Sequence, residues 1–251
     1  MSDVCVVAIT GASGGIGAAI ALGLAKKGGY SIVLLARRKE ELEKVALLCN
    51  GCAVAFVADC SIREQVAAAV AFSIQTFGKL DVFINNAGQG CSVRAMQMTD
   101  ANIDDMMSAN VKSAVYGMQE AAKVWKAHNV KGHIINVSSV LGRLPFPTPQ
   151  AGIRSAYTGA KHFLNAITEV FRDDLAADGI TVSLFSPGPV ATDFGINASG
   201  VDSRHLPGTQ DVQEVADVLI EECIVHRRVD VYSRPVYAEW VAKYYSVVSS
   251  R

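Results

Sequence analysis

The sequence predicts an α/β protein whose doubly wound sheet has about seven mostly parallel strands, with helices on both faces. Short apolar segments alternate with longer segments of helical periodicity along almost the whole chain. This alternation implies right-handed crossovers and a parallel sheet that helices cover on both sides. Half of the residues are hydrophobic and the mean hydropathy is +0.25, as expected for a sheet buried on both faces.

The length and composition fit one large domain. The 251 residues contain no repeats, no low-complexity tracts and no linker that would divide them. We therefore expect a single domain over residues 1–251, with a C-terminal tail from about residue 233. No apolar run reaches the roughly 18 residues that would span a bilayer, so we expect no membrane span.

Individual elements follow from local patterns. The apolar run at 4–10 predicts a strand, and the helical pattern at 16–27 ends at two glycines, as a C-cap does. Thr99 is placed to cap a long helix over 99–128, and apolar spacings of three and four predict a helix over 155–177. The other helices are expected at 37–48, 62–77 and 211–225. The other strands are expected at 31–36, 53–58, 81–85, 133–137, 180–185 and 229–232, with a loop rich in Gly, Ser and Asn reaching about residue 210.

The charge and the cysteines argue against several classes of function. The formal net charge is −1, so nothing favours nucleic acid or an acidic membrane surface as a partner. Cys49 and Cys52 lack the second pair, or the histidines, that would complete a zinc site. We interpret them as two buried cysteines flanking the Asn50-Gly51 turn, and we expect no metal. Scattered cysteines and an N-terminus without a secretory pattern lead us to expect a cytoplasmic protein.

A glycine-rich segment joins the first strand to the first helix. Glycine permits a tight turn and lets a pyrophosphate approach without a Cβ in the way. The helix N-terminus adds free N–H groups and a partial positive charge. Since the segment follows a strand and precedes a helix, it favours a Rossmann-type dinucleotide site over a purely structural turn. The candidate cofactor contacts in it are Gly11, Ser13, Gly14, Gly15, Ile16 and Gly17.

Tyr157 and Lys161 stand four residues apart near the start of the helix predicted over 155–177. Residues at this spacing share one face of a helix, so the phenol and the ammonium can point into the same space. A nearby cation favours the phenolate and lowers the pKa of a tyrosine, which is about 10 in a free side chain. Taken alone, the pair is more typical of a solvated helix.

Several motifs occur along the chain in a specific order. They are Thr10-Gly11-x-x-x-Gly15-Ile16-Gly17, Asn85-Asn86-Ala87-Gly88, Asn110, Ser139, Tyr157-x-x-x-Lys161 and Pro187-Gly188. This order resembles that of the short-chain dehydrogenase/reductase family, in its common single-domain branch. The resemblance covers about residues 4–232, and the joint occurrence of the motifs is far more specific than any one of them.

The resemblance implies hydride transfer between a nicotinamide cofactor and a carbonyl or alcohol. Ser139 would then donate a hydrogen bond to the substrate carbonyl, with Ser138 as a capping neighbour. Tyr157 would give its proton to the developing alkoxide, while Lys161 binds the nicotinamide ribose hydroxyls and keeps the phenol acidic. Asn110, which is locally unfavourable inside a helix, would hold a water that links Lys161 to solvent; the alternative is an ordinary polar interior position.

The same resemblance assigns residues to the rest of the cofactor. Asp59 would accept from the adenine amino group, with Cys60 beside it. The segment Asn86-Ala87-Gly88 would line the adenine ribose; the alternative is a turn that asparagine side chains stabilise. The segment after the sixth strand would hold the nicotinamide carboxamide through Pro187, Gly188, Val190 and Thr192.

The end of the second strand selects between the two nicotinamide dinucleotides. An acidic residue there accepts from the ribose 2′-hydroxyl of NAD, whereas an arginine suits the 2′-phosphate of NADP. Here Ala36 is followed by Arg37 and Arg38. Cations at a helix N-terminus are disfavoured by the helix dipole, which suggests that an anion meets them. We therefore expect NADP(H); the alternative is that both arginines form only a solvated helix start.

The substrate pocket is expected to be lined by loops. Its wall would comprise Gln89, Gly90, Cys91, residues 141–146 and the loop 193–210. The rigid insert at 143–149 is interpreted either as one side of this pocket or as a subunit contact. His205, a lone loop histidine, is interpreted as solvent-facing.

Subunit contacts are expected as well. By the family resemblance, the helices over 99–128 and 155–177 would pack against symmetry mates in a homodimer or homotetramer, with Ala114, Gly117 and Ala160 permitting close approach. The tail residues Tyr237, Trp240 and Tyr244 recur at helical spacing. They are interpreted either as packing against their own chain or as covering a subunit interface.

The sequence therefore predicts an NADP(H)-dependent ketone or aldehyde reductase, or the matching alcohol dehydrogenase, for a small to medium apolar substrate. One alternative is an NAD-dependent alcohol dehydrogenase of the same fold, against which Arg37 argues. The other is a non-catalytic nucleotide-sensing protein, against which the intact Ser139, Tyr157 and Lys161 argue.

Overall fold

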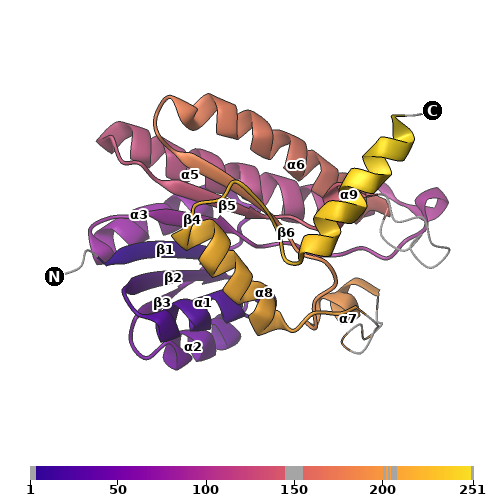
Figure 1. Cartoon of the computed structure of the whole chain (residues 1–251). Coiled ribbons are helices and arrows are strands. Elements are labelled where there is room, and N and C mark those ends of the chain that lie inside the picture. The colour runs from indigo at the N-terminus through magenta and orange to yellow at the C-terminus, as the bar shows by residue number, and fades with distance from the viewer. Residues whose placement is uncertain (1–3, 145–154, 200–201, 203, 205–207, 250–251) are drawn as a thin grey trace.

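The apolar runs of the sequence form the strands of one parallel sheet. The computed structural model describes residues 4–144, 155–199, 202, 204 and 208–249. Within these residues, seven strands lie in the order β3-β2-β1-β4-β5-β6-β7, and every neighbouring pair is parallel (Figure 1). The strands are β1 (Cys5–Thr10), β2 (Tyr30–Ala36), β3 (Ala53–Val57), β4 (Val82–Asn85), β5 (His133–Val137), β6 (Thr181–Ser186) and β7 (Asp230–Tyr232). The doubly wound, Rossmann-type sheet predicted from the sequence is confirmed.

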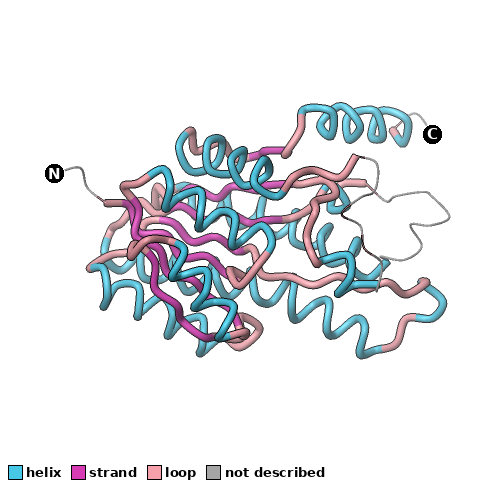
Figure 2. Tube along the Cα trace, turned by 90° about the horizontal axis from the view of Figure 1, so that it is seen from below, coloured by secondary structure: helices cyan, strands magenta, loops and turns pink. Residues whose placement is uncertain are grey.

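Helices cover both faces of this sheet, and Figure 2 shows the strands enclosed between them. One face carries α1 (Gly15–Lys27), α2 (Lys39–Leu48) and α8 (Val212–Val218). The other face carries α3 (Arg63–Phe77), α5 (Ser113–His128) and α6 (Ser155–Ala176). Each interface has its own apolar core, with Leu24 fully buried in the first and Phe83 in the second.

The strand order places a crevice at the carboxyl ends of the central strands. The chain winds from β1 outward to β3 and then returns to β4 on the other side of β1. At such a switch point the loops after β1 and β4 lead away in opposite directions, and ligands of open α/β sheets bind in the crevice between them. The glycine-rich segment follows β1, and the motif at Asn85-Asn86-Ala87-Gly88 closes β4 and follows it. Both motifs therefore border the crevice.

A buried polar chain crosses the centre of the fold. Asn85 Nδ2 donates to Asn136 Oδ1 at 2.8 Å, and Asn136 Nδ2 donates to Thr168 Oγ1 at 2.9 Å. These contacts link β4, β5 and α6 in a region where unpaired polar groups would be costly. A Cβ on Gly117 would lie 2.0 Å from Asn85 Oδ1. Gly117 therefore makes room for Asn85 inside the chain, and the expectation that it faces a second subunit is wrong.

The structure departs from the predicted helices at several places. The helix expected over 99–128 is interrupted by a π-helical segment, Ser108–Lys112, between α4 (Asp100–Met107) and α5. A second π-helical segment, Leu219–Val225, continues α8. The loop expected before residue 210 contains a short helix, α7 (Phe194–Ser199), and short 3₁₀ turns lie at Ala95–Gln97 and Val140–Gly142.

The C-terminal tail is a helix, α9 (Pro235–Val248), which lies at the edge of the molecule (Figure 2). Tyr237 is buried, whereas Trp240, one turn further along the helix, is exposed. None of the described helices has both the length and the apolar character needed to cross a bilayer.

Candidate active site

The start of α6 brings Tyr157 and Lys161 together, as their spacing predicts. Both side chains are buried, and Lys161 Nζ lies 5.7 Å from the centroid of the Tyr157 ring. Lys161 Nζ also donates to the carbonyl oxygen of Val137 at 2.9 Å, which ties α6 to the end of β5. Burial lowers the pKa of Lys161 from 10.5 to about 8. The solvated-helix interpretation of this pair is therefore wrong.

Ser139 lies just beyond β5, at the start of the 3₁₀ turn Val140–Gly142. Its Oγ accepts from the Leu141 N–H at 3.1 Å, so Ser139 itself caps this turn. Ser138 was expected to be the capping neighbour, but its Oγ donates to Asn165 Oδ1 on α6. The two serines point to different partners because successive residues of extended backbone face opposite sides.

Asn110 lies within the π-helical segment and is almost fully buried. Its Nδ2 donates to the carbonyl oxygens of Gln89, at 2.9 Å, and Met106, at 3.2 Å. Its Oδ1 has no hydrogen-bond partner among the described residues. A Cβ on Gly88 would lie 2.6 Å from this oxygen and 3.7 Å from Lys161 Nζ, so a glycine is needed between the two side chains.

An apolar cluster surrounds the Tyr157 ring. Met106, Val111 and Leu141 belong to it, and the Phe194 ring of α7 lies 5.4 Å from the Tyr157 ring, centroid to centroid. The short helix α7 therefore contributes an aromatic ring to the cluster around Tyr157. A low-dielectric surrounding of this kind strengthens the electrostatic interactions that act on buried polar groups.

A cavity of about 250 Å³ opens beside this cluster. It is lined by Gln89, Gly90, Cys91, Ser92, Val93, Asn102, Asp105, Met106 and Ala198. Four of these residues, Gln89, Gly90, Cys91 and Ala198, were expected to form the substrate wall. Residues 145–149 of the insert, and His205 in the later loop, lie outside the described residues.

The glycine-rich turn is held in shape by the β4 motif. Gly11 and Gly15 have positive φ angles of +67° and +54°, which glycine adopts without strain. A Cβ on Gly11 would lie 2.9 Å from the Ala87 Cα, and one on Gly17 would lie 2.6 Å from Asn86 Nδ2. Asn86 Nδ2 donates to the Thr10 carbonyl oxygen at 2.9 Å. The asparagine side chain thus stabilises the glycine-rich turn.

This turn can accept a dinucleotide. It lies directly before α1, and Ile16 packs partly buried against the core below it. A Cβ on Gly15 would reach within 3.4 Å of Thr192 Cγ2, so the turn and the 187–192 segment lie close together. Bare backbone at a helix N-terminus, next to a second loop, suits a pyrophosphate group.

The two arginines that follow β2 contact different neighbours. Arg38 donates to Ser13 Oγ from Nη2 at 3.0 Å and from Nε at 3.2 Å, and its Nη2 lies 3.2 Å from where a Cβ of Gly14 would be. Arg37 Nη1 lies 4.0 Å from Asp59 Oδ2. The helix expected over 37–48 begins only at Lys39, so both arginines precede its first turn.

Asp59 and Cys60 follow β3. Burial acts to raise the pKa of Asp59, but hydrogen bonds from Ser61 and the charge of Arg37 together lower it below its usual value. Cys60 is buried, which raises the pKa of its thiol to about 12. The Cys60 side chain is therefore neutral, whereas Asp59 is an ionised acceptor.

The segment from Pro187 to Thr192 is fixed from behind by the C-terminal part of the chain. A Cβ on Gly188 would lie 2.3 Å from the Tyr237 ring, and the Gly188 N–H donates to Ser233 Oγ at 3.3 Å. Val190 forms a parallel bridge with Gln210. Tyr237 therefore packs against its own chain, which decides between the two interpretations for this residue.

Comparison with known proteins identifies the family. A family model described as short chain dehydrogenase matches residues 5–200.

The chain belongs to the short-chain dehydrogenase/reductase family.

Its relatives agree with this assignment. An uncharacterised oxidoreductase of Staphylococcus epidermidis is 35% identical over 218 residues, which cover 86% of this chain and 89% of that protein. A farnesol dehydrogenase of Aedes aegypti is 34% identical over 223 residues, covering 83% and 86%.

Solved structures share the fold. A short-chain dehydrogenase from Sphingobium yanoikuyae in complex with NADPH has a TM-score of 0.81 at 28% identity, covering 98% of this chain and 94% of that one. A short-chain dehydrogenase/reductase from Burkholderia phymatum in complex with NAD has a TM-score of 0.87 at 23% identity, covering 100% and 97%.

As a short-chain dehydrogenase/reductase, the protein is an oxidoreductase that uses a nicotinamide dinucleotide. Within its site, one residue was missed at the level of sequence: Asn165, a buried asparagine on the same face of α6 as Lys161. An asparagine four residues after the lysine, amid apolar neighbours, was the available signal. Phe194 lies in the loop that was expected to line the substrate pocket, although the helix that carries it was not expected.

Proposed function

We propose that this protein is an NADP(H)-dependent oxidoreductase that transfers hydride between nicotinamide and a ketone or aldehyde, or the corresponding alcohol. The observation that carries the proposal is the buried pair Tyr157 and Lys161, with Ser139 close by in the chain fold: its Oγ accepts from the N–H of Leu141, whose side chain belongs to the apolar cluster around Tyr157. A hydroxyl, a phenol and a cation at one point suit a substrate oxygen that gains negative charge.

Each side chain has a separate task in this proposal. The nicotinamide, when bound, supplies or takes the hydride. Ser139 Oγ donates a hydrogen bond to the substrate oxygen, and the Tyr157 hydroxyl gives that oxygen its proton. Lys161, with a pKa of about 8, stays mostly protonated at neutral pH, so its charge stabilises the phenolate that remains. Asn110 holds a water that returns the proton from solvent.

The remaining cofactor contacts follow from the geometry of the turns. Bare backbone in the glycine-rich turn binds the pyrophosphate, and Asp59 accepts from the adenine amino group. The segment from Pro187 to Thr192 holds the carboxamide, because Tyr237 and Gln210 fix it from behind.

The proposed substrate is an apolar ketone, aldehyde or alcohol. The groups nearest the Tyr157 ring are apolar side chains, with Met106, Leu141 and Phe194 among them. Burying such a substrate against these side chains contributes binding free energy in proportion to the apolar area removed from water. The farnesol dehydrogenase among the relatives is named for an alcohol of the same apolar class.

NADP(H) is proposed over NAD(H) because two cations lie at the end of β2. Arg38 rests on the glycine-rich turn through an exposed bond to Ser13, and Arg37 lies beyond it beside Asp59. A 2′-phosphate on the adenine ribose would meet both guanidinium groups, and Ala36 at the end of β2 offers no carboxylate to accept from a 2′-hydroxyl.

A cofactor and substrate panel tests this function. Purified protein is given NADPH or NADH with a series of apolar ketones and aldehydes, and the loss of absorbance of the reduced cofactor is followed. We expect turnover that is faster with NADPH. A preference for NADH would favour an NAD-dependent alcohol dehydrogenase of the same fold. Tight cofactor binding without turnover on any carbonyl would favour a nucleotide-sensing protein instead.

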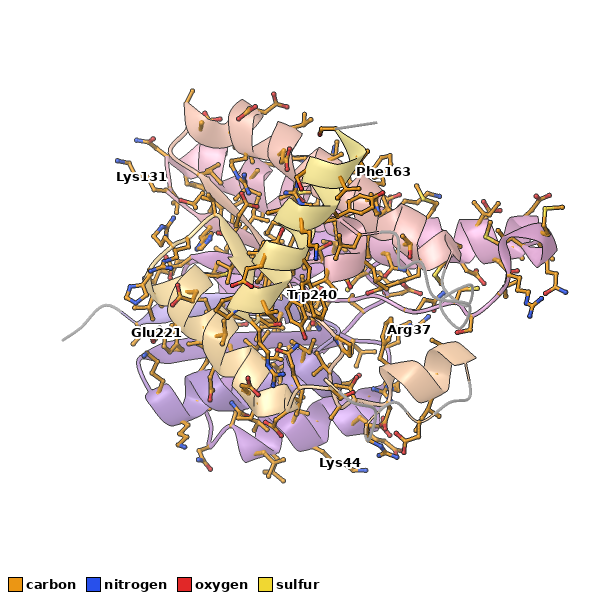
Figure 3. The ribbon with its side chains drawn as sticks, turned by 45° about the vertical axis from the view of Figure 1, so that its right-hand side comes forward. Arg37, Lys44, Lys131, Phe163, Glu221 and Trp240 are labelled. Carbon is orange, nitrogen blue, oxygen red and sulfur yellow. The ribbon has the colours of Figure 1, made fainter. Side chains whose placement is uncertain are left out.

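The proposed assembly is a homodimer or homotetramer. Ala114 and Ala160 are buried inside the chain, so the expectation that they form the contact is wrong. The outward side of α6 instead exposes Phe163, Ala166 and Val170, which are spaced three and four apart. Figure 3 shows Phe163 on the same side of the molecule as Trp240 of α9.

Light scattering tests this assembly. We expect a dimer or tetramer at micromolar concentration and a smaller species for Phe163→Asp, because the carboxylate would be desolvated in the interface. A monomeric wild-type protein would contradict the proposal. A cytoplasmic location is proposed with it, since none of the six cysteines, all of which the structure describes, forms a disulfide.

A further inference from the structure

We infer that Asn165 is a positioning residue for Ser139: its side-chain amide fixes both ends of the segment Ser138–Gly142 to α6. The inference rests on the proposed function, because it concerns where the Ser139 hydroxyl stands relative to the Tyr157 phenol. Asn165 lies four residues after Lys161 and eight after Tyr157 on α6, so the three side chains share one face of the helix.

Both the oxygen and the nitrogen of the Asn165 side-chain amide form hydrogen bonds. Its Oδ1 accepts from Ser138 Oγ, immediately before Ser139. Its Nδ2 donates to the Gly142 carbonyl oxygen at 2.9 Å, three residues after Ser139. The side chain is only 4% exposed, so water cannot readily replace either bond. Ser139 is thus held between two contacts to a single side chain.

The surrounding backbone is shaped for this contact. A Cβ on Gly142 would lie 2.6 Å from Asn165 Nδ2, closer than any real contact allows. One turn earlier on α6, Lys161 Nζ donates to the Val137 carbonyl oxygen. The helix therefore holds the chain from Val137 to Gly142 at three places, and Asn165 supplies two of them.

The position of the Ser139 hydroxyl relative to the Tyr157 phenol must be fixed by contacts between separate elements. Ser139 follows a strand whereas Tyr157 lies on a helix, so no local backbone geometry sets the distance between the hydroxyl and the phenol. Both groups must reach the same substrate oxygen, and a displacement of about 1 Å in such an arrangement can reduce the rate by about 100-fold. By fixing Ser138 and Gly142 to the helix that carries Tyr157, Asn165 sets this distance.

A double-mutant cycle with Ser139 distinguishes positioning from a general structural role. In the wild-type background we expect Asn165→Ala to lower kcat by about 10- to 100-fold, with the KM for NADPH changed less than about twofold. In the Ser139→Ala background, the same substitution should change kcat less than about twofold, because the group that it positions is gone. An equal fold-loss of kcat in both backgrounds would overturn the inference.

A matched control comes from the next turn of α6. Thr168 is also buried and hydrogen-bonded, with its Oγ1 donating to the Leu164 carbonyl oxygen and accepting from Asn136, and neither of these bonds goes to the segment Ser138–Gly142. Thr168→Val should lower the thermal unfolding midpoint as Asn165→Ala does, yet keep kcat within about twofold of wild type. A fall in kcat equal to that of Asn165→Ala would show that the loss of any buried hydrogen bond on α6 has the same effect. That result would overturn the inference.

Asn165→Asp gives a second readout that does not depend on the alanine variant folding. A carboxylate at this position still accepts from Ser138 but repels the Gly142 carbonyl oxygen. Burial raises the pKa of such a carboxyl, and its protonated form regains a donor. We expect the turnover of this variant, relative to wild type, to rise as the pH falls. A ratio independent of pH would count against the inference.

Tyr157→Phe, measured in the same experiment, distinguishes a failure of the proposed function from a failure of the positioning role of Asn165. If that variant keeps a tenth or more of wild-type turnover, the proposed function itself fails. If it loses activity while Asn165→Ala acts equally in both backgrounds, only the positioning role fails.

Discussion

The crevice has two ends that are built differently: the chemical end holds Tyr157 and Lys161, and the proposed nucleotide end holds Arg37 and Arg38. At the chemical end, Ser139, Tyr157 and Lys161 are all less than 8% exposed, and the serine and lysine are hydrogen-bonded to backbone. At the proposed nucleotide end, the Arg37 side chain, labelled in Figure 3, is 71% exposed. The first end is thus fixed by packing before any ligand binds, whereas the second relies on exposed charges that can move.

This difference has an energetic meaning. Exposed ion pairs and hydrogen bonds typically contribute about 0–1 kcal/mol, so Arg37 and Arg38 can leave Asp59 and Ser13 at little cost and turn to a phosphate. A buried group has no such freedom, because removing its partner leaves a desolvated polar atom that costs about 1–3 kcal/mol. Substitutions at the chemical end should therefore have the larger effects.

The largest effect is expected at Tyr157. Tyr157→Phe keeps the ring within its apolar cluster but removes the transferable proton, and general acid catalysis typically contributes 10²- to 10⁴-fold. We expect kcat to fall by at least about 100-fold, with the Kd for the cofactor nearly unchanged. Steady-state kinetics and a fluorescence titration of the cofactor measure the two quantities. A variant with a tenth of wild-type turnover would show that Tyr157 is not the acid.

The buried charge of Lys161 predicts a pH dependence of stability. Its pKa is about 8 in the folded protein and 10.5 in the unfolded chain, so between these values the unfolded chain binds more protons. The free energy of unfolding contributed by this group therefore rises with pH from about 8 to 10.5, and the contribution is lost as the pH falls through this window. The full shift corresponds to roughly 3 kcal/mol.

Urea denaturation of wild type and Lys161→Met at several pH values measures this contribution. The methionine variant lacks the titrating group, so the difference between the two proteins should change in favour of wild type as the pH rises. Groups that titrate equally in both proteins cancel in the comparison. Parallel stability profiles from pH 8 to 10.5 would mean that burial does not disfavour the ammonium.

The smallest expected effect is cofactor selection at the nucleotide end. A charged hydrogen bond to a 2′-phosphate contributes roughly 1.5–3 kcal/mol, which is about 10- to 150-fold in affinity. Wild-type protein should therefore prefer NADPH to NADH by at least about tenfold in kcat/KM. Arg37→Ala should erase most of this preference, and the double variant with Arg38→Ala should erase more. Values for NADH should stay nearly unchanged.

Lys44→Ala serves as the control, because it removes a cation from α2 away from the end of β2. It should leave the NADPH preference intact. The preference should also weaken as salt is added, since the arginines are exposed and screened. If Arg37→Ala lowers kcat/KM equally for both cofactors, the arginines do not recognise the phosphate.

Most of the fold could be predicted from the sequence, because hydrophobic periodicity indicates where the strands and the long helices form. The strands and the long helices lie within a few residues of their predicted bounds. The start of α2 was misplaced because Arg38 has extended backbone, with ψ at 96°, although its side chain suits a helix. The helix α7 was missed because its six residues are too few for a periodic pattern.

The motifs that line the crevice could be found in the sequence, but their supporting contacts could not. The side chain of Asn86 holds the glycine-rich turn, a contact that the motif alone does not reveal. Ser138 and Asn165 are 27 residues apart in the chain, and no local pattern relates two such positions. These contacts depend on which elements pack together, so they become visible only once the fold is complete.

The π-helical segment Ser108–Lys112 has a consequence for how this chain tolerates insertions and deletions. A π turn closes its hydrogen bond over one residue more than an α turn does. Deleting one residue here would therefore leave α4 and α5 as a continuous regular helix, with the faces of both preserved. Asn110, however, would no longer point at Gln89 and Gly88. A single-residue deletion at this place would thus separate folding from function more cleanly than many substitutions. The extra residue of the π turn makes the helix irregular at the point where the Asn110 side chain is directed inward.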